Sequence, residues 1–212
     1  MDLIIDFISQ NPIQIIAAII TFLWVYFEIK ASMWMFPIGV ILPLIWIFLS
    51  WQSRFYGNII VNAYYLITTI IGWVMWVRHP KQSEDGGIKT LDMKVLLWSL
   101  LAISIVSVPV YGMLSDCFGW FGLAPDQTSS LPWADTISTL ISFVGMVWLA
   151  LKIKEQWLCW FIANILSAIV FFHANDPVSG FIFLVNVVLS IVGYLQWIKF
   201  QKEEQKALKN NY

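Results

Sequence analysis

The chain has 212 residues, of which 59% are hydrophobic, 17% aromatic and only 12% charged, and its net charge is −1. Soluble domains carry about 25% charged residues, and a chain of this size buries only about 70% of its unfolded surface on folding. This composition excludes a soluble globular protein, and its aromatic content excludes a disordered chain. The near-neutral charge gives no basis for binding nucleic acid.

Seven charge-free runs predict seven transmembrane helices in an all-α integral membrane protein. A helix needs about 20 apolar residues to cross the hydrocarbon core of a bilayer, and every run except the slightly shorter fifth reaches the usual length. Because lipid offers backbone groups no hydrogen-bond partner, such spans are helical. In chain order the runs are Phe7–Phe27, Ala31–Ser53, Phe55–Val77, Val95–Ser115, Thr136–Leu151, Gln156–Asn175 and Pro177–Ile198.

The basic residues lie almost all on one side of these spans. Of the 12 Lys and Arg, only Arg54 falls on the side of the N-terminus. The positive-inside rule therefore predicts an external N-terminus and a cytoplasmic tail at residues 200–212. The first run has no basic residue before it, so we do not expect it to be a cleaved signal peptide.

An internal repeat organises the chain. A shift of 121 residues places Thr69–Trp73 on Ser190–Tyr194 and Trp76 on Trp197. Each unit has three spans, so a single extra span between them makes the two units run parallel, which is a known plan for transporters. A duplicated structural bundle without a transport pathway is the alternative. The predicted 3+1+3 arrangement consists of a first repeat at 10–78, a linker helix at 94–114 and a second repeat at 134–199.

The sixth span carries two indoles and a carboxamide on one helix face. Trp157, Trp160 and Asn164 are separated by three and four residues, a spacing that aligns side chains on a helix. Such a face can hold a flat ring with polar edges, and indole faces attract cations. The alternatives are an interfacial position for Trp157 and packing with an interhelical hydrogen bond for the other two.

Other polar residues inside the spans suggest that this slot belongs to a shared cavity. Asn58, Asn62 and Tyr65 share one face of the third span, and the seventh span carries Asn186, which the shift places on Tyr65. Amides in hydrocarbon are costly unless paired, so mutual hydrogen bonding is the alternative. Trp34 begins the second span, at the equivalent of the Trp157 region, and is included as a candidate pocket residue.

Two acidic residues, Glu28 and Glu155, stand near the predicted cytoplasmic ends of the first and sixth spans. They are candidates for a gate or for contact with a cationic substrate, and pairing with adjacent lysines is the alternative. No acidic residue lies at mid-membrane, which argues against proton coupling. The sequence contains no P-loop, no catalytic motif and no His/Cys cluster. We therefore expect no enzyme activity, catalytic residue, cofactor or metal.

These features resemble the PnuC family of vitamin transporters, whose plan is similar to that of the SWEET sugar carriers. The resemblance rests on Trp157, Trp160 and Asn164, on the repeat, and on the segment Glu28–Trp34. It implies facilitated diffusion of a vitamin or precursor, nicotinamide riboside by default, across the bacterial inner membrane, with uptake driven by a separate soluble kinase. It also implies that the Trp/Asn motif contacts the substrate and that Asn186 helps to complete the pocket.

The resemblance leaves the vitamin open. Asn58 and Asn62 stand where members that transport nicotinamide riboside tend to carry an acidic residue and a Gln, and Ala63–Tyr65 is similar to the branch associated with thiamine. Both vitamins are flat cationic heterocycles. A membrane substrate-binding subunit that needs a partner ATPase is the alternative from another class, and a homo-oligomer is left open.

Overall fold

The computed structural model describes residues 12–52, 56–79, 87–117, 119, 122 and 128–210, and this part of the chain folds into seven helices. Their positions follow the apolar runs, except that the last helix continues through the charged segment at 199–210. The helices are α2 (Pro12–Ile29), α3 (Met35–Gln52), α4 (Tyr56–Arg78), α5 (Met93–Ser115), α6 (Pro132–Ala150), α7 (Gln156–His173) and α8 (Pro177–Asn210).

Five of these helices are long and apolar enough to cross a membrane. They are α4 to α8, and the apolar windows found in α2 and α3 are shorter, at Ala18–Ile29 and Met35–Phe48. The start of the first expected span, at Phe7, lies outside the described residues. The all-helical membrane class is confirmed, whereas the grouping of the helices as 3+1+3 stays a prediction.

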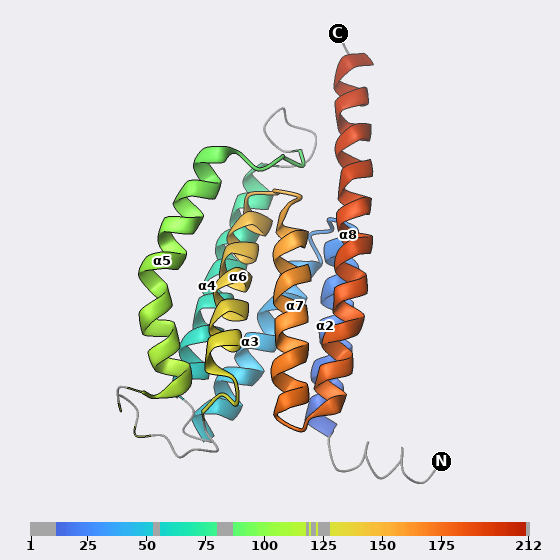
Figure 1. The fold of residues 1–212 in the computed structure, drawn as a ribbon. Coiled ribbons are helices and arrows are strands. Elements are labelled where there is room, and N and C mark those ends of the chain that lie inside the picture. The colour runs from blue at the N-terminus through green and yellow to red at the C-terminus, as the bar shows by residue number, and fades with distance from the viewer. Residues whose placement is uncertain are drawn as a thin grey trace.

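Six of the helices form a closed ring, and the seventh lies outside it (Figure 1). Around the ring, α2 packs on α3, α3 on α4, α4 on α6, α6 on α7, α7 on α8, and α8 on α2. The outer helix, α5, packs on α6 and leaves most of its apolar surface exposed. Because lipid is as apolar as these side chains, an outer helix of this kind needs no further protein cover.

Two turns with the same backbone geometry lie 121 residues apart. Ala31, after α2, has a φ of 46°, and Lys152, after α6, has a φ of 60°, a region that residues with a Cβ seldom adopt. The same two backbone hydrogen bonds close each turn: from Ala31 to Glu28 and Ser32 to Phe27 in the first, and from Lys152 to Leu149 and Ile153 to Trp148 in the second.

Two buried tryptophans cross-link the ring reciprocally. The indole N–H of Trp76 on α4 donates to the backbone carbonyl of Leu149 on α6, at 3.2 Å. The indole N–H of Trp197 on α8 donates to the carbonyl of Glu28 on α2, at 2.9 Å. The two donors, Trp76 and Trp197, are 121 residues apart, and so are the two acceptors, Glu28 and Leu149. Each repeat therefore donates one hydrogen bond to the other and accepts one from it, as a two-fold axis between the repeats would require.

Candidate functional site

A fully buried carboxyl group lies where α2 meets α7. Glu28 has no exposed surface, and its Oε1 accepts a hydrogen bond from the indole Nε1 of Trp160 at 2.9 Å. Trp24, one helical turn before Glu28 and therefore on the same face, packs edge-on against the Trp160 ring with centroids 5.7 Å apart. The structure thus joins Glu28 to the predicted Trp/Asn motif.

The first turn of α7 adds further buried polar groups to this site. Gln156 has no exposed surface, and its amide lies beside the Glu28 carboxyl group. Neither amide atom of Gln156, nor Oε2 of Glu28, nor the indole nitrogen of Trp157 completes a hydrogen bond. Buried polar groups are normally paired, so this concentration of unpaired groups marks the site as one with capacity for a polar ligand.

Trp157 also has a packing role. Its ring lies edge-on to Trp197 with centroids 6.0 Å apart, and a Cβ at Gly193 would lie 2.5 Å from the Trp157 ring. Gly193 is therefore the residue that lets α8 approach α7 closely.

Asn164 and Asn186 lie together between α7 and α8. The side-chain amide of Asn164 donates to the Ser190 hydroxyl at 3.4 Å, and that hydroxyl donates to the backbone carbonyl of Asn186 at 2.7 Å. Asn186 is buried, and its side-chain oxygen accepts no hydrogen bond. The structure thus brings together the two asparagines that the sequence placed on different helices.

Tyr65 lies in an aromatic group at the contact of α4 with α6. Its ring packs edge-on to Phe143 at 5.7 Å, and the neighbouring Tyr64 hydroxyl donates to the Phe143 carbonyl at 2.8 Å. Tyr64, Tyr65 and Trp160 all pack against the buried cluster that contains Trp157. Tyr65 is therefore close to the Trp/Asn motif through a shared core.

Asn58 and Asn62 form a separate polar group with Ser50. The Asn58 amide donates to the Ser50 hydroxyl at 2.7 Å, and the Asn62 amide donates to the side-chain oxygen of Asn58 at 3.0 Å. These hydrogen bonds stay within α3 and α4. They match the mutual pairing weighed as the alternative for buried amides, and they do not link this pair to Trp160.

Trp34 lies apart from the other candidates. It belongs to the turn before α3, and 65% of its side chain is exposed. Its equivalence to the Trp157 region therefore stays a matter of the repeat alignment. Its neighbours Ala31, Met35 and Phe36 are buried in the core, so of these four residues only Trp34 is exposed.

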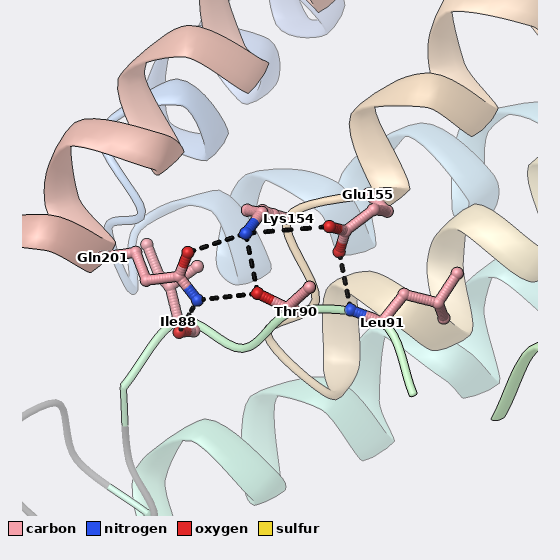
Figure 2. A network of polar contacts seen from close by, with 6 residues as sticks. All are labelled: Ile88, Thr90, Leu91, Lys154, Glu155 and Gln201. Atoms are coloured by element: carbon pink, nitrogen blue, oxygen red, sulfur yellow. Dashed lines mark hydrogen bonds and ion pairs between the residues drawn. The ribbon is translucent and has the colours of Figure 1, made fainter. Parts of the chain in front are cut away.

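Glu155 anchors the segment that precedes α5 (Figure 2). Its Oε2 accepts from the backbone N–H of Leu91 at 2.8 Å, and its Oε1 lies 3.7 Å from Nζ of Lys154. Lys154 in turn donates to Thr90 and Gln201. Oε2 of Glu155 thus ties Leu91 to the α6–α7 turn, and Oε1 pairs with Lys154, whose ammonium group binds Thr90 in the same segment.

The cavity beside the site is small. It has a volume of about 10 Å³, which is room for about one water molecule. It lies between α2, α3, α4 and α6, where Trp24, Phe36, Gly72 and Ala150 contribute to its wall. Sites for organic ligands occupy about 300–1,000 Å³, so this cavity as it stands is too small for a vitamin-sized molecule.

Three residues of the site were not predicted from the sequence: Trp24, Gln156 and Ser190. Trp24 lies four residues before Glu28 and Gln156 lies one before Trp157, so helical spacing could have suggested Trp24. Nothing local distinguishes Ser190 from the other serines of the spans. Among the described residues, no group of three or more His, Cys, Asp or Glu could hold a metal ion.

The profile of the family described as "Nicotinamide mononucleotide transporter" matches residues 11–199. The chain belongs to this family, the family of the PnuC proteins. It is therefore a multi-pass membrane transporter of the bacterial PnuC family and not an enzyme.

Relatives with curated names support this membership. A protein of Neisseria mucosa named nicotinamide riboside transporter PnuC is 26% identical over 88% of this chain and 72% of its own length. Proteins with the same name from Escherichia coli K12 and Haemophilus influenzae are 25% and 27% identical, over 72% and 77% of this chain and 70% and 69% of their own. The crystal structure of a vitamin B3 transporter PnuC superposes with a TM-score of 0.67 at 24% identity, covering 93% of this chain and 86% of that one. At this identity the superposition shows the same fold.

Proposed function

We propose that this protein carries nicotinamide riboside across the membrane by facilitated diffusion. The observation that carries the proposal is the buried site at Glu28 and Trp160, where indoles, a carboxylate and unpaired amides meet. Aromatic faces suit the flat pyridinium ring, and the polar groups suit its carboxamide and the ribose hydroxyls. The names of the Neisseria, Escherichia and Haemophilus relatives point to the same substrate.

The binding residues we propose are Trp157, Trp160, Asn164 and Asn186, with Tyr65 beside them. The unpaired indole nitrogen of Trp157 and the unpaired side-chain oxygen of Asn186 supply a donor and an acceptor in addition to the Asn164 amide. Asn58, Asn62 and Trp34 would join the pocket only if helix movement brought them to it.

For the transport step, we propose that two parallel three-helix units rock around this site. The matching turns after α2 and α6 and the reciprocal indole hydrogen bonds support the two units, which correspond to the repeats at 10–78 and 134–199. The linker helix at 94–114 falls on α5, outside the ring. A duplicated structural bundle without a transport pathway is disfavoured because the chain belongs to a family of transporters.

Uptake by this mechanism depends on a second protein. Facilitated diffusion only equilibrates a solute, so we propose that a soluble kinase traps the vitamin by phosphorylation in the cytoplasm. Thiamine remains the alternative substrate, since it too is a flat cationic heterocycle of the kind that indole faces attract. We place the protein in the inner membrane with its N-terminus outside and its C-terminus in the cytoplasm, on the asymmetry of its basic residues.

Proteoliposomes test this proposal directly. Purified protein is reconstituted with a nicotinamide riboside kinase and ATP inside, and labelled nicotinamide riboside is added outside. We expect accumulation that requires both protein and kinase, with thiamine and a thiamine kinase as the parallel arm. Failure to accumulate either vitamin would contradict the carrier and favour a binding subunit that needs a partner ATPase.

A further inference from the structure

Glu28 is a buried acid without a positive partner. In the described part of the chain, no Lys or Arg forms an ion pair with its carboxyl group. Lys30, two residues further on, donates instead to the hydroxyl of Tyr26 and lies over that ring. Lys152 donates to the backbone carbonyl of His79 and lies over the Trp76 ring. The basic side chains nearest in sequence and in the equivalent turn are thus turned to other groups.

A carboxylate in this position is costly. A buried charge that lacks an opposite charge costs several kcal/mol. The Trp160 indole donates to Oε1 and the neutral Gln156 amide lies beside the carboxyl group, but Oε2 completes no hydrogen bond. The site must therefore receive its positive charge from something that enters it. A cationic ligand and a proton are the two sources available.

The surroundings favour the ligand. Trp160 binds the carboxyl group through its indole N–H, and Trp24 packs edge-on against the Trp160 ring. Indole faces stabilise organic cations but offer nothing to a proton. Gln156 adds a neutral donor and acceptor that are also unpaired, which fits a ligand with polar edges as well as a charge. A site built for protonation alone needs neither the rings nor the amide.

We propose that Glu28, flanked by Gln156 and Trp160, is the subsite that reads the positive charge of the transported ring. This inference rests on the proposed function and names the residue that sets its specificity. Glu28 makes the carrier prefer a cationic heterocycle over an uncharged molecule of the same shape, because the cationic ligand compensates the buried carboxylate and the uncharged ligand does not.

Two ligands of matched shape test the charge subsite. Nicotinamide riboside carries a pyridinium charge, and benzamide riboside replaces the charged ring nitrogen with carbon. Isothermal titration calorimetry on the purified full chain measures both dissociation constants for the wild type and for Glu28→Gln. We expect the wild type to bind nicotinamide riboside at least tenfold more tightly than benzamide riboside. In Glu28→Gln we expect this ratio to fall within threefold of one, with the benzamide riboside affinity changed less than threefold.

The matched control is Glu204→Gln. Glu204 accepts from the backbone N–H of Ile88, outside the site, so this variant should keep the wild-type ratio. The proposal would be overturned if Glu28→Gln still bound nicotinamide riboside at least tenfold more tightly than benzamide riboside. It would also be overturned if the substitution weakened the binding of both ligands equally. If Glu28→Gln does not fold, the wild type decides alone: equal binding of the two ligands means that a proton, and not the ligand, supplies the charge.

Failure of the proposed function gives a different result. A wild type that does not bind nicotinamide riboside refutes that substrate, and the comparison of wild type with Glu28→Gln is then made with thiamine. At least tenfold weaker thiamine binding in the variant would support the charge subsite for another cation. Equal thiamine binding, or no binding of either cation, would overturn it.

Discussion

Trp160 and Asn164 each hold a hydrogen bond to another helix, to Glu28 on α2 and Ser190 on α8. A ligand that uses these groups replaces a protein partner with one of its own, so binding at the site is coupled to the contacts of α7 with both neighbours. Exchanging one hydrogen bond for another costs little, whereas leaving a buried donor unpaired costs about 1–3 kcal/mol. These residues can therefore serve packing and recognition in turn.

Truncating this motif should weaken binding without unfolding the protein. We expect Trp160→Ala and Asn164→Ala each to weaken nicotinamide riboside binding at least tenfold, which corresponds to about 1.4 kcal/mol. Calorimetric titration measures the affinity, and gel filtration checks that folded protein remains. Trp98→Ala on the exposed face of α5 is the control and should bind as the wild type does. Unchanged affinity in both site variants would remove the pocket assignment.

At the scale of the helices, close approach depends on where glycine falls. A Cβ at Gly193 of α8 would meet the Trp157 ring at 2.5 Å, and one at Gly72 of α4 would meet Phe36 at 3.1 Å and Ala150 at 3.2 Å. The contact of α7 with α8 thus has no room for a methyl group, whereas the contacts of α4 need only a small adjustment. The difference follows from the size of the residues at equivalent positions, an indole in one unit and a phenyl ring in the other.

This difference predicts unequal effects of the same substitution. Gly193→Ala should destabilise the protein by about 1–3 kcal/mol, the usual cost of overpacking, and should weaken vitamin binding because Trp157 must move. Gly72→Ala should cost less. Thermal unfolding in detergent with tryptophan fluorescence compares the two variants. A Gly72→Ala protein less stable than Gly193→Ala would contradict the close contact at Trp157.

At the scale of the whole molecule, the two reciprocal indole hydrogen bonds join α4 to α6 and α8 to α2. These are the places where the proposed units meet. Each accepting carbonyl also accepts a second hydrogen bond from a backbone N–H of the adjacent turn. The N–H of Lys152 donates to Leu149 and that of Ala31 donates to Glu28, so each carbonyl keeps one partner when the indole is removed. Rocking of the two units would have to alter both contacts.

Equivalent substitutions should therefore have equivalent effects. We expect Trp76→Phe and Trp197→Phe each to lower the free energy of unfolding by about 2–3 kcal/mol, because each loses one hydrogen bond, worth about 1 kcal/mol, and part of a buried ring. Chemical denaturation of the two proteins side by side gives the comparison. A stability loss confined to one of the two would argue against the two-fold relation.

The orientation in the membrane gives a further test. With 11 of the 12 basic residues on the side of the tail, a green fluorescent protein fused after Tyr212 should fluoresce, and alkaline phosphatase fused there should be inactive. A phosphatase fusion at the N-terminus behind an exported leader is the matched control and should be active. The reverse pattern would overturn the predicted topology.

Much of this architecture could be predicted from the sequence because it depends on local chemistry. The length of a charge-free run decides whether a helix can cross a bilayer, and α4 to α7 begin and end within four residues of the expected limits. The last helix, α8, begins at Pro177 as expected but continues to Asn210, 12 residues beyond the expected end at Ile198. The spacing of Trp157, Trp160 and Asn164 placed them on one face of α7 for the same reason. Membership of the PnuC family followed from that motif and the repeat.

Only the tertiary structure decided which groups meet. Helical periodicity specifies the face of a residue but not the partner on the next helix, because the partner depends on the rotation and depth at which two helices pack. The hydrogen bond from Trp160 to Glu28, across 132 positions, could not be read from either segment alone. The pairing of Asn164 with Ser190 could not be read from the sequence either. The same holds for the separation of Asn58 and Asn62 from these two residues. The sequence by itself determined a helical membrane transporter with an aromatic and amide face, and packing placed a buried carboxylate against that face.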